Sequence, residues 1–193
     1  MGFSLKDSKI NNAMKLKINN KNIQRAREVI KKGGMIIYPT DTLHGLGGNI
    51  FNQQAVKKIF IIKKRSFKKS ISVMVSNFED IKRLAFVGKQ QEKIIKKLLP
   101  GPYTILLKKK KIVPGLLTAG SDKIGIRIPK SKFCQNLAKD LPITATSANI
   151  SGEKNFNYQK LKAVDLIFIG GKISGKPSAI IDLTKKPFEI IKR

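Results

Sequence analysis

Side chains that could bind an anionic substrate occur in three short segments of the sequence. An apolar run over 35–38 ends at Pro39 and is followed directly by Thr40, Asp41 and Thr42. A cationic segment covers 63–69, and a second apolar run ends in the hydroxyls and the amide of 144–149. Strand ends that carry such groups are typical of the rim of a pocket in an α/β fold, although an ordinary tight loop has the same local composition. We expect the three segments to converge on one cleft.

The cations Lys63 and Arg65 have the spacing that a phosphate site needs. At the end of a helix, residues two apart can turn to one side, and arginine supplies a bidentate fork for a phosphate group. The alternative is a solvated basic turn, since the chain contains 34 lysines. Neither a Walker loop nor a Gly-x-Gly-x-x-Gly element occurs, so a site of either kind is not indicated.

Metal and triad chemistry find little support in the composition. The chain has one histidine and one cysteine, Cys134, and its acidic residues are not clustered, so no protein-held metal is expected. A Ser-His-Asp triad would need His44 as its base, and no Gly-x-Ser-x-Gly turn supplies the nucleophile. We interpret His44 as a hydrogen-bonded wall of the pocket.

The chain length of 193 residues predicts one domain over 1–193, with 1–14 as a flexible N-terminal extension. The lone cysteine allows no internal disulfide, and no apolar run is long enough to span a bilayer, so a cytoplasmic protein without membrane contact is expected. The net charge of +28 should attract polyanions such as ATP or RNA.

Strand and helix patterns alternate along most of the chain. Asn52 is the expected N-cap of a helix that carries Ala55 and Val56 inward, and Ser76 with Glu79 offers a capping box for another helix. Arg127 interrupts an apolar strand over 124–129. The order is not a clean βαβ repeat, which predicts an α/β fold with a twisted mixed parallel and antiparallel sheet, helices on both faces and an open cationic cleft.

Several motifs together carry a family resemblance. They are Tyr38-Pro-Thr-Asp-Thr-Leu-His-Gly-Leu-Gly47, Lys63-x-Arg65 with Lys69, Pro100-Gly-Pro-Tyr-Thr104, Ile126-Arg-Ile-Pro129, Ser147-x-Asn149 and Pro177-Ser-Ala-Ile-Ile-Asp182. In this order and spacing, over about 20–192, the chain resembles the YrdC-like family of threonylcarbamoyl-adenylate synthases. It departs from the family pattern at His44, Ser66 and Met74.

The resemblance implies a nucleotidyltransferase that makes threonylcarbamoyl-AMP and pyrophosphate from L-threonine, bicarbonate and ATP, with Mg²⁺ carried by the ATP phosphates. Partner proteins would then transfer the product to tRNA. Carried over by motif, Lys63 and Arg65 are catalytic. The residues expected to hold threonine are Thr40, Arg127 and Ser178. Those expected to line the ATP site are Lys63, Arg65, Lys69, Lys123, Ala145, Ser147, Asn149, Asn155 and Lys192.

Two other readings remain open at this point. The net charge suits a non-catalytic module that binds double-stranded RNA or tRNA, although the chain has no tryptophan and no aromatic-rich element for base stacking. The residues at 44 and 74 suit a paralogue of the same fold that acts on a different amine.

Overall fold

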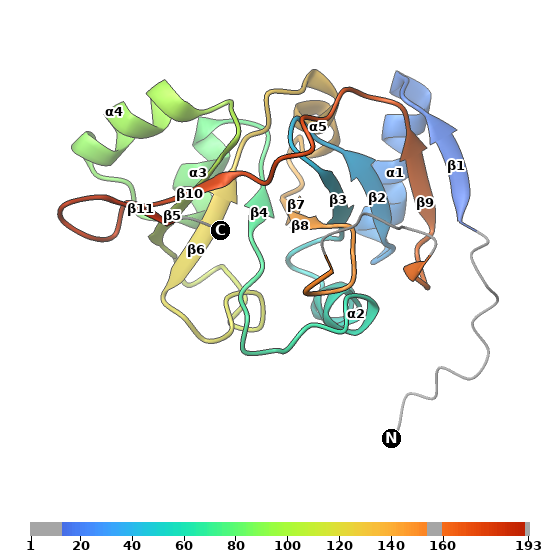
Figure 1. Cartoon of the computed structure of the whole chain (residues 1–193), viewed down its shortest axis with the longest axis horizontal. Helices are drawn as coiled ribbons and strands as arrows, with labels where there is room; N and C mark the ends of the chain where they lie inside the picture. Colours follow the sequence, from blue (N-terminus) through green and yellow to red (C-terminus); the bar gives the residue numbers. More distant parts are fainter. Residues whose placement is uncertain (1–12, 154–159, 192–193) are drawn as a thin grey trace.

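The computed structural model describes residues 13–153 and 160–191, and the strands form two hydrogen-bonded sheets that meet near the centre (Figure 1). The predicted mixed sheet with helices is confirmed, with the difference that it is divided in two. Residues 1–12 of the expected N-terminal extension lie outside the described residues, while Met14 already belongs to a strand.

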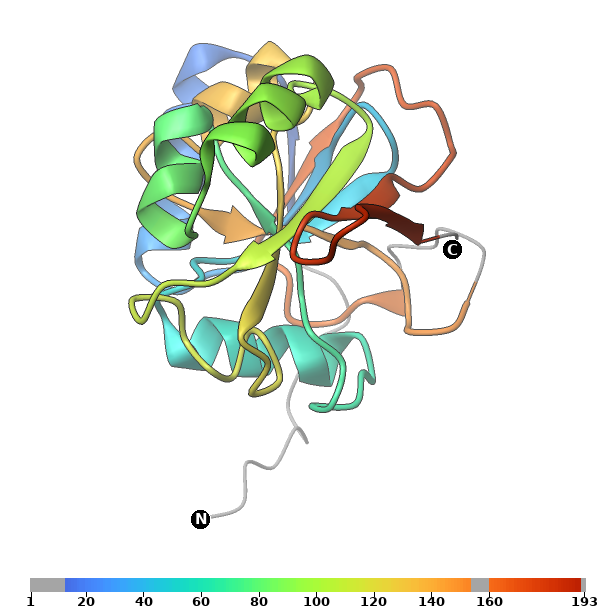
Figure 2. The same ribbon diagram turned by 90° about the vertical axis from the view of Figure 1, so that its left-hand side faces the viewer.

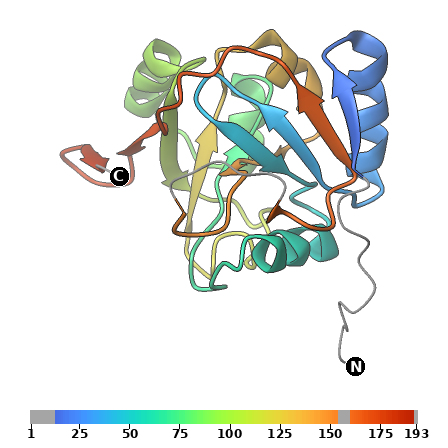
Figure 3. The ribbon, with the colours of Figure 1, turned by 45° about the vertical axis from the view of Figure 1, so that its right-hand side comes forward.

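The first sheet has five strands in the order β1-β9-β2-β3-β8, and β1, β9 and β2 run parallel (Figure 3). Antiparallel pairing then joins β2 to β3 and β3 to β8. The bounds are Met14–Lys17 (β1), Ile36–Pro39 (β2), His44–Gly47 (β3), Thr146–Ser147 (β8) and Leu166–Ile169 (β9).

The second sheet has six strands in the order β11-β10-β5-β6-β4-β7. Parallel pairs join β10 to β5 and β4 to β6, and the other neighbours are antiparallel. The bounds are Val73–Met74 (β4), Tyr103–Lys108 (β5), Lys123–Arg127 (β6), Ile143–Thr144 (β7), Ala179–Asp182 (β10) and Glu189–Ile191 (β11).

Helices cover both faces of the first sheet, as alternation along β2 requires. Ile36 and Tyr38 pack in one cluster with α1 and α5, whereas Ile37 packs in the other cluster with α2. Figure 2 shows α2 at the lower end of the molecule, away from α3 and α4, which lie beside the second sheet. The helices are Asn20–Lys31 (α1), Gln53–Ile62 (α2), Phe78–Leu84 (α3), Lys89–Leu98 (α4) and Lys132–Leu137 (α5).

Of the two helix N-caps predicted from the sequence, one is confirmed and the other is wrong. Asn52 caps α2 by accepting from the backbone N of Ala55 at 3.0 Å, as predicted. The capping box expected at Ser76 was wrong, because Asn77 caps α3 and accepts from the backbone N of Asp80 at 2.9 Å. The cap lies one residue further on than predicted, and its amide oxygen binds an N–H group in the first turn of the helix.

Thr144, which is fully buried in β7, joins the two sheets. Its hydroxyl donates to the carbonyl of Leu46 and accepts from the backbone N of Gly48, both at 3.0 Å. Its carbonyl accepts from the Tyr38 hydroxyl at 2.9 Å. All three partners belong to β2, β3 or the residue just after β3. Thr144 therefore connects the two sheets through both its side-chain hydroxyl and its backbone carbonyl.

Tyr38 reaches Thr144 because the strand beside it carries glycines. A Cβ at Gly45 would lie 2.6 Å from Cζ of Tyr38, and one at Gly47 would lie 2.8 Å from its Cε1. Such distances are shorter than any ordinary contact, so the ring occupies the space that side chains at 45 and 47 would need. Burial raises the pKa of Tyr38 far above its usual value, which keeps its hydroxyl a donor.

We expect Thr144→Val to lower the free energy of unfolding by about 1–3 kcal/mol, because it leaves the Leu46 carbonyl and the Gly48 amide without their partner at a buried position. Urea unfolding measures the change. Thr144→Ser keeps the hydroxyl and is the matched control, so an equal loss in both variants would contradict the role given to the hydrogen bonds.

Candidate functional site

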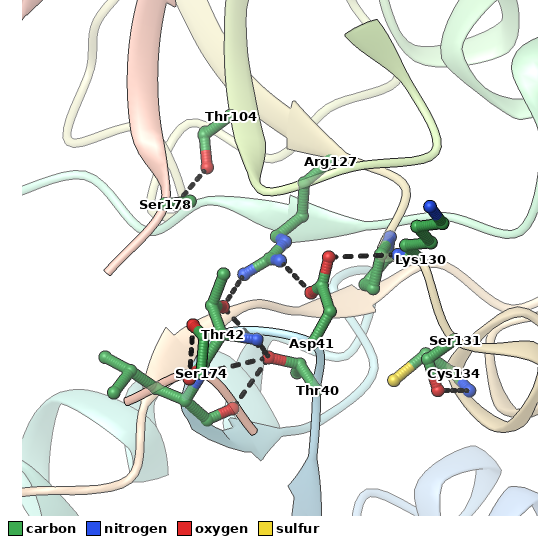
Figure 4. A network of polar contacts seen from close by, with 12 residues as sticks. Thr40, Asp41, Thr42, Thr104, Arg127, Lys130, Ser131, Cys134, Ser174 and Ser178 are labelled. Carbon is green, nitrogen blue, oxygen red and sulfur yellow. Dashed lines mark hydrogen bonds and ion pairs between the residues drawn. The ribbon is translucent and has the colours of Figure 1, made fainter. Parts of the chain in front are cut away.

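Arg127 lies at the end of β6, and its guanidinium reaches from the second sheet to the loop after β2 (Figure 4). Nη1 donates to Oγ1 of Thr42 at 2.8 Å, and Nη2 donates to Oδ1 of Asp41 at 2.5 Å. Arg127 is only 7% exposed. A buried charge needs a partner, and the Asp41 carboxylate supplies it.

The Asp41 carboxylate is itself held on its other oxygen. Oδ2 accepts from the backbone N of Lys130 at 3.0 Å, so the carboxylate bridges the Arg127 guanidinium and the turn that follows β6. Thr40 orders the same loop, since its hydroxyl donates to the Leu43 carbonyl at 2.7 Å and lies 3.0 Å from the Thr42 hydroxyl. These contacts fix the loop that faces the guanidinium.

Arg127 keeps donor capacity for a ligand. A guanidinium has five N–H donors, and the hydrogen bonds to Thr42 and Asp41 use two of them. Its Nε is buried and has no hydrogen-bond partner among the residues that the structure describes. A buried N–H without a partner is rare and costly. A carboxylate or phosphate oxygen placed beside Nε would satisfy it.

Five of the predicted site residues, Arg127 among them, line one small hollow. They come from strands of both sheets, from the loops next to these strands and from the segment before β10. The described lining residues are Tyr38, Thr40, Thr42, Leu43, His44, Gly45, Arg127, Ala145, Thr146, Ser147 and Ser178. The predicted convergence of Thr40, Arg127 and Ser178 with Ala145 and Ser147 is therefore present in the structure. Ser178 is placed by Thr104, since their hydroxyl oxygens are 2.8 Å apart.

Lys63, the C-cap residue of α2, joins this hollow to the cationic segment. Its Nζ donates to the carbonyls of Ser147 and Asn149, the latter at 2.7 Å, and to Oδ1 of Asn149 at 3.2 Å. Burial, with a smaller effect of the Arg65 charge, lowers the pKa of Lys63 to about 8. The ammonium form therefore still predominates at neutral pH.

A second hollow of about 310 Å³ adjoins the first and shares Leu43, His44 and Ser147 with it. Asn149 and Pro177 also line it. The Asn149 side chain is held in place, because its Oδ1 accepts from the Ser147 hydroxyl at 2.6 Å. The two hollows form one cleft with the buried Arg127 cation at one end, neutral polar groups along its wall, and Glu153 in the lining of the second hollow.

Arg65 and Lys69 lie in the loop that follows α2. The Arg65 side chain binds backbone groups of this same loop. The guanidinium donates to the carbonyls of Lys69 at 3.2 Å and Ser70 at 2.7 Å. Neither residue is among the described lining residues of the two hollows. Lys63 nevertheless ties the start of this segment to Ser147, so the cationic loop lies beside the cleft.

One other predicted ATP-site residue, Lys123, lies away from the cleft. Lys123 begins β6, at the opposite end of the strand from Arg127, and pairs with Oδ2 of Asp182 at 3.0 Å. It lines a different hollow, with Phe86 and Lys185. Asn155 and Lys192 lie outside the described residues.

Asp41 and Thr42 have a role that the sequence did not reveal. The sequence places Asp41 only after the strand at the rim of the pocket, whereas in the structure it is the counter-ion of Arg127. The available signal was an arginine inside an apolar strand, which requires a buried partner from elsewhere in the chain.

The described residues contain no group of three or more histidine, cysteine or acidic side chains that could hold a metal ion. Within the same ranges, no helix has the length and apolar character needed to cross a membrane.

The family model described as telomere recombination, which covers the Sua5, YciO and YrdC proteins, matches residues 28–193. A Methanocaldococcus jannaschii protein, provisionally named threonylcarbamoyl-AMP synthase, is 39% identical over 177 residues, covering 86% of this chain and 84% of the relative. The threonylcarbamoyl-AMP synthase of Pyrococcus abyssi is 34% identical over 175 residues, and this chain spans 52% of its length.

Two solved structures have the same fold. The crystal structure of P. abyssi Sua5 complexed with L-threonine is 30% identical with a TM-score of 0.84, and the match covers 94% of this chain and 57% of that one. Escherichia coli YciO is 29% identical with a TM-score of 0.83, and the match covers 94% of this chain and 95% of that one. These comparisons favour the synthase reading over a non-catalytic RNA-binding module.

We expect Asp41→Asn to lower the free energy of unfolding by about 3 kcal/mol, because the Arg127 guanidinium would keep its burial and lose its counter-charge. Urea unfolding at neutral pH measures the loss. Glu79→Gln removes an exposed carboxylate that pairs with Lys82 and is the matched control, with an expected change below about 0.5 kcal/mol. A similar, small change in both variants would argue against a buried ion pair.

Stability should fall on acidification through His44, the only histidine in the chain. Burial lowers the pKa of His44 from its usual 6.5, so below about that pH the unfolded chain binds a proton that the folded chain does not. The free energy of unfolding, measured in urea at pH 7 and pH 5, should drop less for His44→Gln than for the wild type. Equal drops would show that the imidazole titrates alike in both states.

Proposed function

The chain belongs to the Sua5/YciO/YrdC family, and from this premise we propose that it is an L-threonylcarbamoyladenylate synthase. The substrates would be L-threonine, bicarbonate and ATP, and the products threonylcarbamoyl-AMP and pyrophosphate. In this reading the enzyme is a nucleotidyltransferase. The observation that carries the proposal is the buried Arg127 guanidinium, which borders a hollow lined by hydroxyls and whose Nε makes no hydrogen bond among the described residues.

The hollow around Arg127 is small, about 30 Å³, and suits the carboxylate end of an amino acid whose remaining atoms would extend into the adjoining hollow. The carboxylate of threonine would take the free Nε donor of Arg127, since a charged acceptor forms the stronger hydrogen bond there. Thr40 and Ser178 would supply neutral hydroxyls to the rest of the molecule. The relative from P. abyssi, whose structure was solved with L-threonine, supports this choice of ligand.

The adjoining hollow and the cationic loop suit the nucleotide. Ala145, Ser147 and Asn149 would face the adenylate, while Arg65 and Lys69 would meet the phosphates with Lys63 behind them. Arg65 would exchange its present carbonyl partners for phosphate oxygens. The described residues offer no metal-binding cluster of their own, so Mg²⁺ would arrive on the ATP phosphates.

The chemistry asks mainly for alignment of the reactants and stabilisation of charge. The threonine amine attacks the carbon of bicarbonate and water leaves, which gives a carbamate. A carbamate oxygen then attacks the α-phosphorus, and pyrophosphate is the leaving group. Arg127 would fix the amino acid while the cations of the loop balance the charge that develops on pyrophosphate. Partner proteins would pass the threonylcarbamoyl group on to tRNA.

A different amine substrate is the second candidate, because His44 stands in the wall of both hollows where the family pattern has tyrosine. Pyrophosphate release from ATP, measured with a panel of amino acids and bicarbonate, separates the two candidates. The synthase reading expects threonine to give the highest kcat/KM.

Two substitutions should separate the two ends of the cleft in this assay. Arg127→Lys replaces a fork by a point charge and should lower kcat/KM for threonine about a hundredfold, chiefly through KM for threonine. Arg65→Ala should act chiefly through KM for ATP. Lys93→Met, an exposed position on α4, is the charge-matched control and should be neutral. Unchanged pyrophosphate release in both site variants would remove the assignment.

A further inference from the structure

Lys63 makes contacts within the protein that a side chain serving only to bind phosphate would not need. Its ammonium donates to three acceptors on one short segment, the two carbonyls of Ser147 and Asn149 and Oδ1 of Asn149. Its own carbonyl accepts from the backbone N of Ser151 at 2.8 Å. Both ends of the residue therefore hold the segment 147–151.

The donors of Lys63 are fully used in this arrangement. A lysine ammonium has three N–H groups and no acceptor, and three acceptors surround it here. The residue is only 2% exposed. An incoming anion would therefore have to displace one of the carbonyl or amide oxygens before it could contact Nζ.

The segment held by Lys63 borders both hollows, and it reaches the amino-acid hollow through Ser147, while Asn149 lines the second hollow alone. Ser147 in β8 pairs with Gly45 in β3, and the backbone N of Ala148 donates to the His44 carbonyl at 2.8 Å. Ser147 lines both hollows. The wall is thus fixed on one side by β3 and on the other by the ammonium of Lys63.

We propose that Lys63 is a positioning residue for the amino-acid substrate, which holds the wall 147–149 in its binding shape before any nucleotide arrives. The inference rests on the proposed function, since the amino acid is the ligand whose hollow the wall bounds. It assigns to Lys63 an effect on threonine binding in the absence of ATP. A residue that acted only on phosphates would have no such effect.

Calorimetry of L-threonine binding without ATP tests the proposal in the wild type and in three variants. Lys63→Met removes the ammonium and keeps the apolar stem. Lys63→Arg keeps the charge, but its planar guanidinium cannot converge on three clustered oxygens as an ammonium does. Lys68→Met, in the exposed loop, makes the same change of net charge as Lys63→Met and is the matched control.

We expect the threonine Kd to rise by about tenfold or more in both Lys63 variants, and by less than about twofold in Lys68→Met. Unchanged threonine affinity in Lys63→Met would overturn the inference. Preserved affinity in Lys63→Arg, with loss in Lys63→Met, would also overturn it, because the charge alone would then suffice.

Thermal unfolding shows whether each variant folds. Should the Lys63 variants fail to fold, Asn149→Ala removes only the side-chain acceptor of the three, and a rise in the threonine Kd without ATP is still expected. Unchanged affinity in Asn149→Ala would then contradict the proposal. Absence of threonine binding by the wild type would instead count against the proposed function itself.

Discussion

The ion pair between Arg127 and Asp41 is the contact on which the site depends. It places a buried guanidinium from the six-stranded sheet against the loop that leaves the five-stranded sheet. A buried cation without this carboxylate would destabilise the fold, so the loop carrying Thr40 and Thr42 is held at the point where the two sheets meet. The hollow beside Arg127 therefore forms where the two sheets meet, and neither sheet could form it alone.

Much of this arrangement could be predicted from the sequence. Apolar runs and turn residues located most strands, and Arg127 within an apolar series indicated a buried cation. The convergence of the segments at 63 and 147 was expected from the cations and the polar strand end that they carry, and Lys63 contacts Ser147 in the structure. The division into two sheets could not be predicted, because the hydrogen bonds of Thr144 depend on tertiary contacts rather than on local pattern. The sequence also could not show that Lys123 lies outside the site, because its ion pair is with Asp182, which is distant along the chain.

Burial distinguishes the lysines in a chain that has 34 of them. Among the residues described, Lys63 is the one buried lysine. Its ammonium donates hydrogen bonds to two backbone carbonyls and one amide oxygen. The exposed lysines contribute mainly to the long-range positive field, which salt screens. The net charge of the chain is therefore a poor guide to its chemistry, whereas the environment of a single ammonium is informative.

The close approach of Tyr38 to Gly45 and Gly47 links three positions of the chain. A side chain on either glycine would displace the aromatic ring, and loss of the ring would open a void beneath β3. Substitution at one of these positions thus changes what is permitted at the other two. Across the family, sequences are expected to vary at 38, 45 and 47 together, so that the three positions form a single evolutionary unit although they sit on two strands.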